Sequence, residues 1–249
     1  VWCDALSNYI SALGFGQVDM SKYEKFWPAD VHVIGKDILR FHAAIWPGML
    51  LSAGLPLPKS LMVHGFITSG GKKMSKTLGN VIDPIALIDE YGAEAVRYYL
   101  LRHISPFEDG DLTLESFKEA YNANLANGLG NLVSRVMKMS KDNLEKPVEI
   151  PDNTIPRNFL DAFENGNVHT ATSIVWEAIA EIDKKIQETQ PFRLVKTDRG
   201  GAQEIIKKLV VEVYTIARML EPILPQSSET IKKLVRENKA PEKPLFLRK

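Results

Sequence analysis

The spacing of apolar positions changes part-way along the chain, near residue 114. Before that point, two short apolar runs predict buried strands, ADVHVIG at 29–35 and LMVHGFIT at 61–68. The segment 36–54 between them has helical periodicity and contains Pro47, so we expect a helix interrupted at that proline. A helix that joins two strands at this spacing predicts a βαβ crossover and a parallel sheet.

The other signals are helical. Residues 1–15 predict a helix ending near Gly14 or Gly16, and residues 84–107 predict two short helices. From Leu114 onward, apolar residues recur every three or four positions, which is the spacing of one helix face. Three such faces follow one another: Phe117, Tyr121, Leu125, Leu129, Leu132 and Val136; Ile174, Val175, Ala178, Ile179, Ile182 and Ile186; Ile205, Ile206, Leu209, Val213, Ile216 and Leu220.

Prolines separate these helices. Residues 145–158 predict a proline-rich connection after the first helix, and Pro191 and Pro222 end the second and third. Residues 225–235 predict a fourth helix with proline in its first turn. The fold class is therefore α/β plus all-α, and we predict an α/β domain over 1–113 followed by a helical domain over 114–249.

Composition narrows the class of protein. Of 249 residues, 45% are hydrophobic and 25% charged, as in a globular protein, and no apolar stretch is long enough to predict a membrane span. A single cysteine, Cys3, excludes an internal disulfide and a thiolate-rich zinc site. The chain begins with Val1 inside an expected helix, so we expect it to be part of a longer protein.

The net charge is zero but unevenly distributed. Residues 190–249 hold 13 Lys and Arg against 7 Asp and Glu, a net charge of +6, which leaves −6 on the remainder. A basic end can bind a polyanion, and it can equally be a set of solvated helices with lysines on their surface. Charge alone leaves both interpretations open.

The sequence GGKKMSKTLGN, at 70–80, offers the first candidate chemistry. Glycine frees the backbone, lysine supplies mobile positive charge, and ligands of parallel sheets bind beyond the carboxyl ends of the strands. We expect this loop and Gly35–Lys36–Asp37 to be those ends. The loop is not a P-loop, because Gly71 stands where the lysine belongs, and an isolated KxxK on a loop is usually solvated surface.

The residues around the loop add a resemblance. KMSKT is similar to the KMSKS signature of class I aminoacyl-tRNA synthetases, with Thr77 in the last position. Four stretches resemble, in order, the methionyl-tRNA synthetase family within that class, and they cover essentially the whole chain: VWCDALSNYISALG, HVIGKDILRFHAAIWPGML, HGFITSGGKKMSKTLGNVIDP and PLFLR. The resemblance implies the C-terminal half of a Rossmann-type sheet followed by an anticodon-binding bundle.

It also implies a reaction. The family joins the carboxylate of methionine to the α-phosphate of ATP, supplied with Mg2+, and then passes the methionyl group to tRNA(Met). Chemistry of this kind needs positioning and charge neutralisation. Lys73 and Lys76 would act on the leaving pyrophosphate as catalytic groups. The resemblance implies these ATP-binding residues: Gly35, Asp37, Ile67, Ser75 and Lys76.

Two spacings suggest a pocket. Trp2, Ala5 and Tyr9 share one helix face, and Ile38 and His42 share another. From the residues alone, a face of this kind is more often core than pocket. The resemblance implies that these five residues enclose the methionine side chain, whose polarizable thioether attracts aromatic rings.

A polar strip on the first bundle helix suggests a second site. Asn124, Gly128, Asn131 and Arg135 follow one edge of the helix, which by spacing alone is an ordinary polar edge. The resemblance implies that Asn131 and Arg135 read the CAU anticodon. It also implies that the ring of Phe192, where relatives often have tryptophan, stacks on an anticodon base.

The HIGH signature and the zinc-bearing insertion of the family both belong upstream and are missing from the sequence. We therefore expect a C-terminal portion without a metal site that does not activate methionine by itself. Two alternatives remain: a class I synthetase for leucine, isoleucine, valine or cysteine, and a non-catalytic tRNA-binding module. The single cysteine, Cys3, fits a reducing cytoplasm, so we expect a cytoplasmic protein without a membrane partner. The sequence does not give the oligomeric state.

Overall fold

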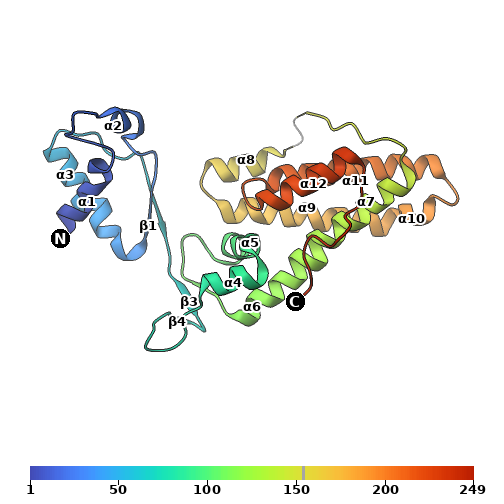
Figure 1. The fold of residues 1–249 in the computed structure, drawn as a ribbon, viewed down its shortest axis with the longest axis horizontal. Coiled ribbons are helices and arrows are strands. Elements are labelled where there is room, and N and C mark those ends of the chain that lie inside the picture. The colour runs from blue at the N-terminus through green and yellow to red at the C-terminus, as the bar shows by residue number, and fades with distance from the viewer. Residues whose placement is uncertain (153–154) are drawn as a thin grey trace. The chain divides into compact units, whose positions relative to one another are not determined.

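The computed structural model describes residues 1–152 and 155–249, and the chain forms two compact units (Figure 1). Unit 1 comprises Val1–Ile67 and Ser105–Gly110, and unit 2 comprises Thr68–Ile104 and Asp111–Lys249. Each unit has its own apolar core. The domain boundary that we predict after residue 113 does not coincide with this division and stays a prediction.

Unit 1 contains the predicted parallel strands. Strands β1 and β2 pair in parallel, with His32 opposite Leu61 and Gly35 opposite His64. The crossover between them is helical, so the βαβ prediction is confirmed. The elements of this part of the chain are α1 (Trp2–Ser11), α2 (Ser21–Phe26), β1 (His32–Gly35), η1 (Lys36–Ile38), η2 (Phe41–Ile45), α3 (Trp46–Ser52) and β2 (Leu61–His64).

The crossover is not broken at Pro47, where we expected an interruption. It passes from the 3-10 turn η1 through the π-helical turn η2 into α3, with Pro47 in the first turn of α3. Proline removes one backbone donor, and the change from π to α winding occurs at the place where that donor is missing. The interruption is thus a change of winding rather than a break.

The run LMVHGFIT forms two strands, not the single strand that we expected. β2 ends at His64, and β3 (Ile67–Ser69) belongs to a different sheet, of order β4–β3–β5. Gly65 separates them, because an added Cβ there would lie 2.2 Å from backbone atoms of Glu108. The close approach of this returning segment leaves room only for glycine and ends the parallel strand.

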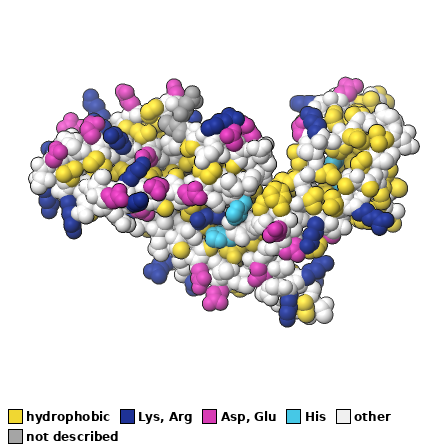
Figure 2. All heavy atoms as spheres, turned by 180° about the vertical axis from the view of Figure 1, so that it is seen from behind, with side chains coloured by type: hydrophobic (Ala, Val, Ile, Leu, Met, Phe, Trp, Pro, Cys, Tyr) yellow, Lys and Arg dark blue, Asp and Glu magenta, His cyan; other side chains and the backbone are white. Residues whose placement is uncertain are grey.

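The core of unit 1 is small and its surface is unusually apolar. Trp27, Trp46 and Leu50 are buried in it, whereas Val31 and Val33, at strand β1, are 48% and 64% exposed. Figure 2 shows hydrophobic side chains over much of the visible face of this unit. Parallel sheets are normally covered on both faces, so β1 presents an uncovered apolar side.

Unit 2 is built mainly from helices. The elements that follow β3 are β4 (Lys72–Lys73), α4 (Pro84–Tyr91), α5 (Ala93–His103), β5 (Gly110–Asp111), α6 (Leu114–Ala120), η3 (Tyr121–Gly130), α7 (Asn131–Asn143), α8 (Arg157–Glu164), α9 (Val168–Thr189), α10 (Pro191–Leu194), α11 (Arg199–Leu220) and α12 (Pro225–Glu237). The predicted helical bundle is confirmed, and with the parallel pair of unit 1 so is the fold class.

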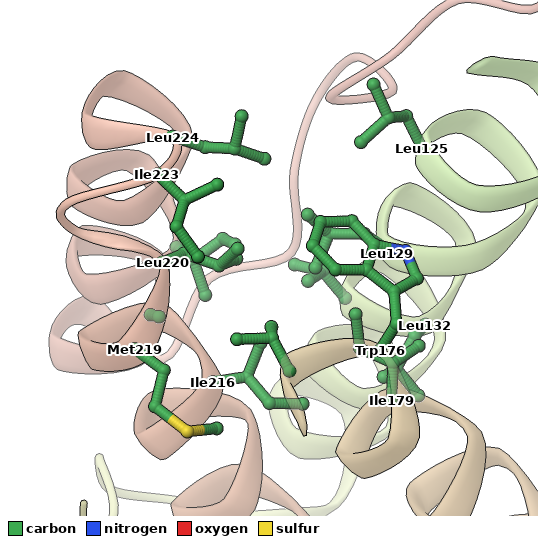
Figure 3. Close-up of a cluster of buried hydrophobic side chains, with 14 of the residues drawn as sticks. Leu125, Leu129, Leu132, Trp176, Ile179, Ile216, Met219, Leu220, Ile223 and Leu224 are labelled. Carbon is green, nitrogen blue, oxygen red and sulfur yellow. The ribbon is translucent and has the colours of Figure 1, made fainter. Parts of the chain in front are cut away.

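The three predicted apolar faces meet in one core. Leu129, Leu132, Ile179, Ile216 and Leu220 are each at most 4% exposed. Figure 3 shows these side chains converging from separate helices around the indole of Trp176. Full burial of such side chains contributes roughly 1.5–3 kcal/mol each, which makes this cluster the main source of bundle stability.

The helix that carries the polar strip has a π-helical middle. Segment η3 continues α6 into α7 without a break, and Gly130 lies where an added Cβ would approach the Leu125 carbonyl to 3.1 Å. The indole of Trp176 donates to the Asn124 carbonyl within this segment, at 3.4 Å. π-helical segments are rare and often lie at functional sites.

Short helices were missed by the periodicity. Helix α8 begins at Arg157, inside the segment 145–158 that we predicted as a connection, of which residues 153 and 154 lie outside the described part of the chain. Helices α2 and α10 span only a few residues. Helices α2 and α10 carry too few apolar positions to define a face, whereas α8 does have one, with Phe159 and Ala162 buried, which we did not predict. No helix in the described ranges has both the length and the apolarity to cross a membrane.

Gly65→Ala should destabilise unit 1 by about 1–3 kcal/mol, because the new methyl group would overlap the backbone at Glu108. Gly48→Ala is the matched control, since no atom lies near its added Cβ and alanine favours a helix over glycine by about 1 kcal/mol. Urea unfolding followed by tryptophan fluorescence measures both. A Gly65→Ala protein as stable as the wild type would contradict the packing described above.

Candidate functional site

Three of the residues predicted to bind methionine are joined by hydrogen bonds in unit 1. The Tyr9 hydroxyl lies 2.9 Å from Nε2 of His42, and Nδ1 of His42 lies 3.0 Å from the Ile38 carbonyl oxygen. A carbonyl oxygen only accepts, so Nδ1 carries the hydrogen, and in the neutral ring Nε2 accepts from Tyr9. His42 is buried and Tyr9 is 37% exposed, so the ring of Tyr9 can meet a ligand.

The π-helical turn η2 places His42 for this contact. It follows η1, which contains Ile38, and the spacing of four residues brings the imidazole back over the Ile38 carbonyl. Trp2 stacks on Phe41, with ring centroids 3.8 Å apart and planes 11° apart, and Ala5 is exposed on α1. The five predicted residues therefore come from two neighbouring segments of unit 1.

A second histidine, His32, supports this group and was not predicted. Its ring lies 4.4 Å from that of Tyr9, and Nε2 accepts from the Trp46 indole at 3.3 Å. Burial, with a smaller effect from the neighbouring His42, lowers the pKa of His32. The signal in the sequence was a histidine within an apolar strand, where an ionisable ring needs a partner.

The residues predicted at the strand ends lie beside an ion pair. Gly35 ends β1, and an added Cβ there would approach a carboxylate oxygen of Asp37 to 2.7 Å. The next residue, Lys36, pairs with Asp109 at 2.6 Å. Lys36 and the backbone N–H of Phe66 together lower the pKa of Asp109. The Asp37 side chain itself is exposed.

The lysine loop, residues 70–80, lies in unit 2. It begins at the turn of an antiparallel hairpin, which corrects our expectation that it follows a parallel strand. Ser69 of β3 pairs with Lys72 of β4, and Gly70 and Gly71 between them both have positive φ. Asp111 accepts from the Gly71 N–H at 2.9 Å. Ile67, predicted to bind ATP, opens β3 and is 39% exposed.

The loop is held at its base and exposed at its tip. The Asn80 side chain accepts from the Ser75 N–H at 2.9 Å, and the Ser75 hydroxyl accepts from the Leu78 N–H at 3.1 Å. Gly79 has a positive φ, so the chain can turn there. Lys73 and Lys76 are exposed, and Lys76 lies between the two anchored residues. The arrangement presents the Lys76 charge to solvent on a short closed turn.

Two of the three predicted anticodon residues line one cavity in unit 2. Arg135 on α7 and Phe192 on α10 both border a cavity of about 560 Å³, whose other lining residues are Lys138, Met139, Asp142, Asn143, Ile186, Val195 and Lys196. Arg135 Nη1 donates to Asp183 at 2.7 Å. Asn131 is exposed on α7 and borders a separate cavity of about 350 Å³ together with Phe246 and Arg248.

The end of α9 explains how Phe192 reaches this cavity. Gln190 takes a left-handed conformation with φ of 41°, and the buried Pro191 then begins α10. The chain turns sharply, and Phe192 is left 49% exposed at the cavity rim. An aromatic ring held half-exposed by a rigid turn can stack with a planar ligand at small entropic loss.

Comparison with known proteins gives the family. A family model described as tRNA synthetases class I (M) matches residues 1–137. Methionine–tRNA ligase of Clostridium acetobutylicum is 41% identical over 247 residues, which is 93% of this chain and 38% of that protein. The chain belongs to the methionyl-tRNA synthetases.

Other methionyl-tRNA synthetases show the same coverage. Methionine–tRNA ligase of Thermotoga maritima is 39% identical over 98% of this chain and 41% of its own length. The crystal structure of the Mycobacterium tuberculosis enzyme bound by methionyl-adenylate has a TM-score of 0.83 and 35% identity, covering 94% of this chain and 49% of that one. The chain thus spans about two fifths of the length of the curated relatives it matches.

Acidification should destabilise unit 1 through His32. Its native pKa lies below its ordinary value of 6.5, so the unfolded chain binds more protons between the two values, and stability falls as the pH decreases through that window. His32→Gln, which can still accept from Trp46, should flatten this slope. Urea unfolding between about pH 7 and pH 5.5 measures it, in a Trp176→Phe background so that fluorescence reports on unit 1. A slope that His32→Gln leaves unchanged would show that another group is responsible.

Proposed function

We propose that the chain contributes the methionine-recognising, lysine-loop and anticodon-reading parts of a methionine–tRNA ligase that works in the cytoplasm. The observation that carries the proposal is that Arg135 and Phe192, 57 positions apart in the sequence, border one cavity. The chain that holds them is 41% and 39% identical to two methionine–tRNA ligases over most of its length. Its substrates are methionine, ATP as the magnesium complex, and tRNA(Met).

The first reaction forms a mixed anhydride. A carboxylate oxygen of methionine attacks the α-phosphorus of ATP, the bond from that phosphorus to the bridging oxygen breaks, and pyrophosphate leaves. Negative charge grows on the leaving group, so a lysine that approaches it stabilises the transition state more than the resting substrate. Lys76, exposed on its anchored turn, and Lys73 are the groups that we assign to this role.

The Tyr9 and His42 pair supports recognition of the amino acid. His42 is buried and fixed through both ring nitrogens, so the phenol ring of Tyr9 is held at one position. A methionine thioether packs well against such rings, here those of Trp2 and Tyr9. Gly35 and Asp37, with Ile67 and Ser75, are the groups that we assign to ATP.

In the second reaction, a hydroxyl at the 3′ end of tRNA attacks the carbonyl carbon of the anhydride and AMP leaves. The anticodon lies far from that end, so its recognition must be a separate binding event. Unstacked loop bases are read by stacking and by hydrogen bonds to their edges. Phe192 offers the stacking surface, and Arg135 and Asn131 offer the donors.

Lys76→Ala, made in an active methionyl-tRNA synthetase chain that contains these residues, should lower the rate of methionine activation by about 10²–10³ with little change in methionine binding. Lys72→Ala, which removes an exposed lysine of β4 outside the motif, is the matched control. Methionine-dependent exchange of pyrophosphate into ATP is the measurement. Equal activity of the two variants would remove Lys76 from the mechanism.

The 249-residue chain should bind a tRNA transcript with a CAU anticodon weakly and with salt dependence, and Arg135→Ala should weaken that binding about tenfold or more. A transcript whose CAU anticodon is changed should bind the wild-type chain about as poorly as the CAU transcript binds the Arg135→Ala variant. Arg157→Ala, on α8 and outside the cavity, is the control for loss of one positive charge. Filter binding at several salt concentrations tests this, and binding indifferent to both changes would refute anticodon reading.

A further inference from the structure

One residue bonded to the cavity residue Arg135 has no role implied by the family resemblance, namely Asp183. Asp183, on α9, accepts from Arg135 Nη1 at 2.7 Å, and the two side chains are 28% and 37% exposed. Arg135 lines the cavity, whereas Asp183 does not. The carboxylate therefore binds the arginine without itself lining the cavity.

Stability does not account for this pair. The pKa of Asp183 is raised, because burial of its carboxyl outweighs the favourable charge of Arg135. A partly buried ion pair of this kind contributes little net free energy, since loss of hydration offsets the attraction. Its effect lies in the conformation and charge that it gives to Arg135.

The effect on conformation follows from the shape of the guanidinium group. Its five N–H donors lie in one plane, so a bond to one nitrogen restricts the direction of the others. With Nη1 engaged by Asp183, the remaining donors are held in a fixed orientation next to the cavity. A base edge that matches this orientation gains hydrogen bonds without first ordering the side chain.

The effect on charge follows from the cavity rim. Lys138 and Lys196 also line the cavity, with Asp142 as the acidic member. An unpaired Arg135 would add to this basic rim and attract phosphate groups of any sequence. The Arg135–Asp183 pair as a whole carries little net charge, so Arg135 acts mainly as a directional donor.

We infer that Asp183 is a specificity-determining positioning residue, which turns Arg135 from a general attractor of phosphate into an oriented reader of an anticodon base. The inference rests on the proposed anticodon-reading function. It concerns discrimination between anticodons rather than the strength of tRNA binding as such.

Two substitutions separate orientation from charge. Asp183→Ala removes both, so discrimination between the CAU transcript and an anticodon-changed transcript should fall about tenfold, and the salt dependence of log K should steepen by about one. Asp183→Asn keeps an acceptor for Arg135 and loses the charge, so it should keep more of the discrimination and show the steeper salt dependence. Glu212→Ala, which breaks the Lys185–Glu212 pair between α9 and α11, is the matched control and should change neither quantity.

The outcomes are distinguishable. A wild-type chain that does not distinguish the transcripts overturns anticodon reading itself, and this inference with it. A wild type that discriminates, alongside an Asp183→Ala protein with equal discrimination and salt dependence, overturns the inference alone. If Asp183→Ala does not fold by circular dichroism, Arg135→Lys replaces it. That variant keeps the charge without the planar fork, and retained discrimination there would also refute the role of orientation.

Discussion

Unit 2 depends on one packed face, the apolar stripe that runs along η3 and α7. Leu125, Leu129 and Val136 are completely buried on it, and α7 packs against α9, α11 and α12. Interiors at this density do not tolerate rotation of a helix, because each side chain fits between its neighbours. Once the stripe is buried, the direction of every other position on the helix is determined. Asn131 and Arg135 lie at the edge of the stripe for this reason. Burial of the stripe fixes the direction in which they project from the helix.

The cavity at Arg135 and Phe192 and the lysine loop use rigidity in opposite ways. In the bundle, a helix edge and a proline turn hold Arg135 and Phe192 beside a cavity whose apolar lining includes buried Ile186. In the lysine loop, the rigid part is only the base, where Asn80 and Asp111 bind backbone N–H groups. A recognition site benefits from donors held in place before binding, whereas a group that follows a leaving phosphate needs a free side chain on a defined turn.

The sequence predicted what short-range patterns determine. The apolar faces at Leu129, Ile179 and Ile216 came directly from helical spacing, and all three meet in the core. It failed where a distant segment intervenes. Gly65 ends a strand only because the backbone at Glu108 approaches it, and that approach leaves no local pattern. The same holds for the sites: helical spacing placed Arg135 on an exposed edge, but the pairing with Asp183, 48 positions away, depends on how two helices cross. Asp183 follows Ile182, which belongs to the apolar face of α9. Its position in the sequence therefore placed it next to the core, but did not identify it as the partner of Arg135.

The π-helical segment η3 has a consequence for the length of this helix. A π-helical stretch holds more residues per turn than an α-helix, so it shifts the phase between the positions before and after it. Removing one residue between Tyr121 and Gly130 would turn the downstream face by about 100° relative to the upstream one. Either the stripe at Leu132 would leave the core, or the edge with Arg135 would turn away from Phe192. The number of residues between Ala120 and Asn131 thus matters to the proposed anticodon site as much as any side chain, and an alignment gap there would signal a different arrangement of Arg135 and Phe192.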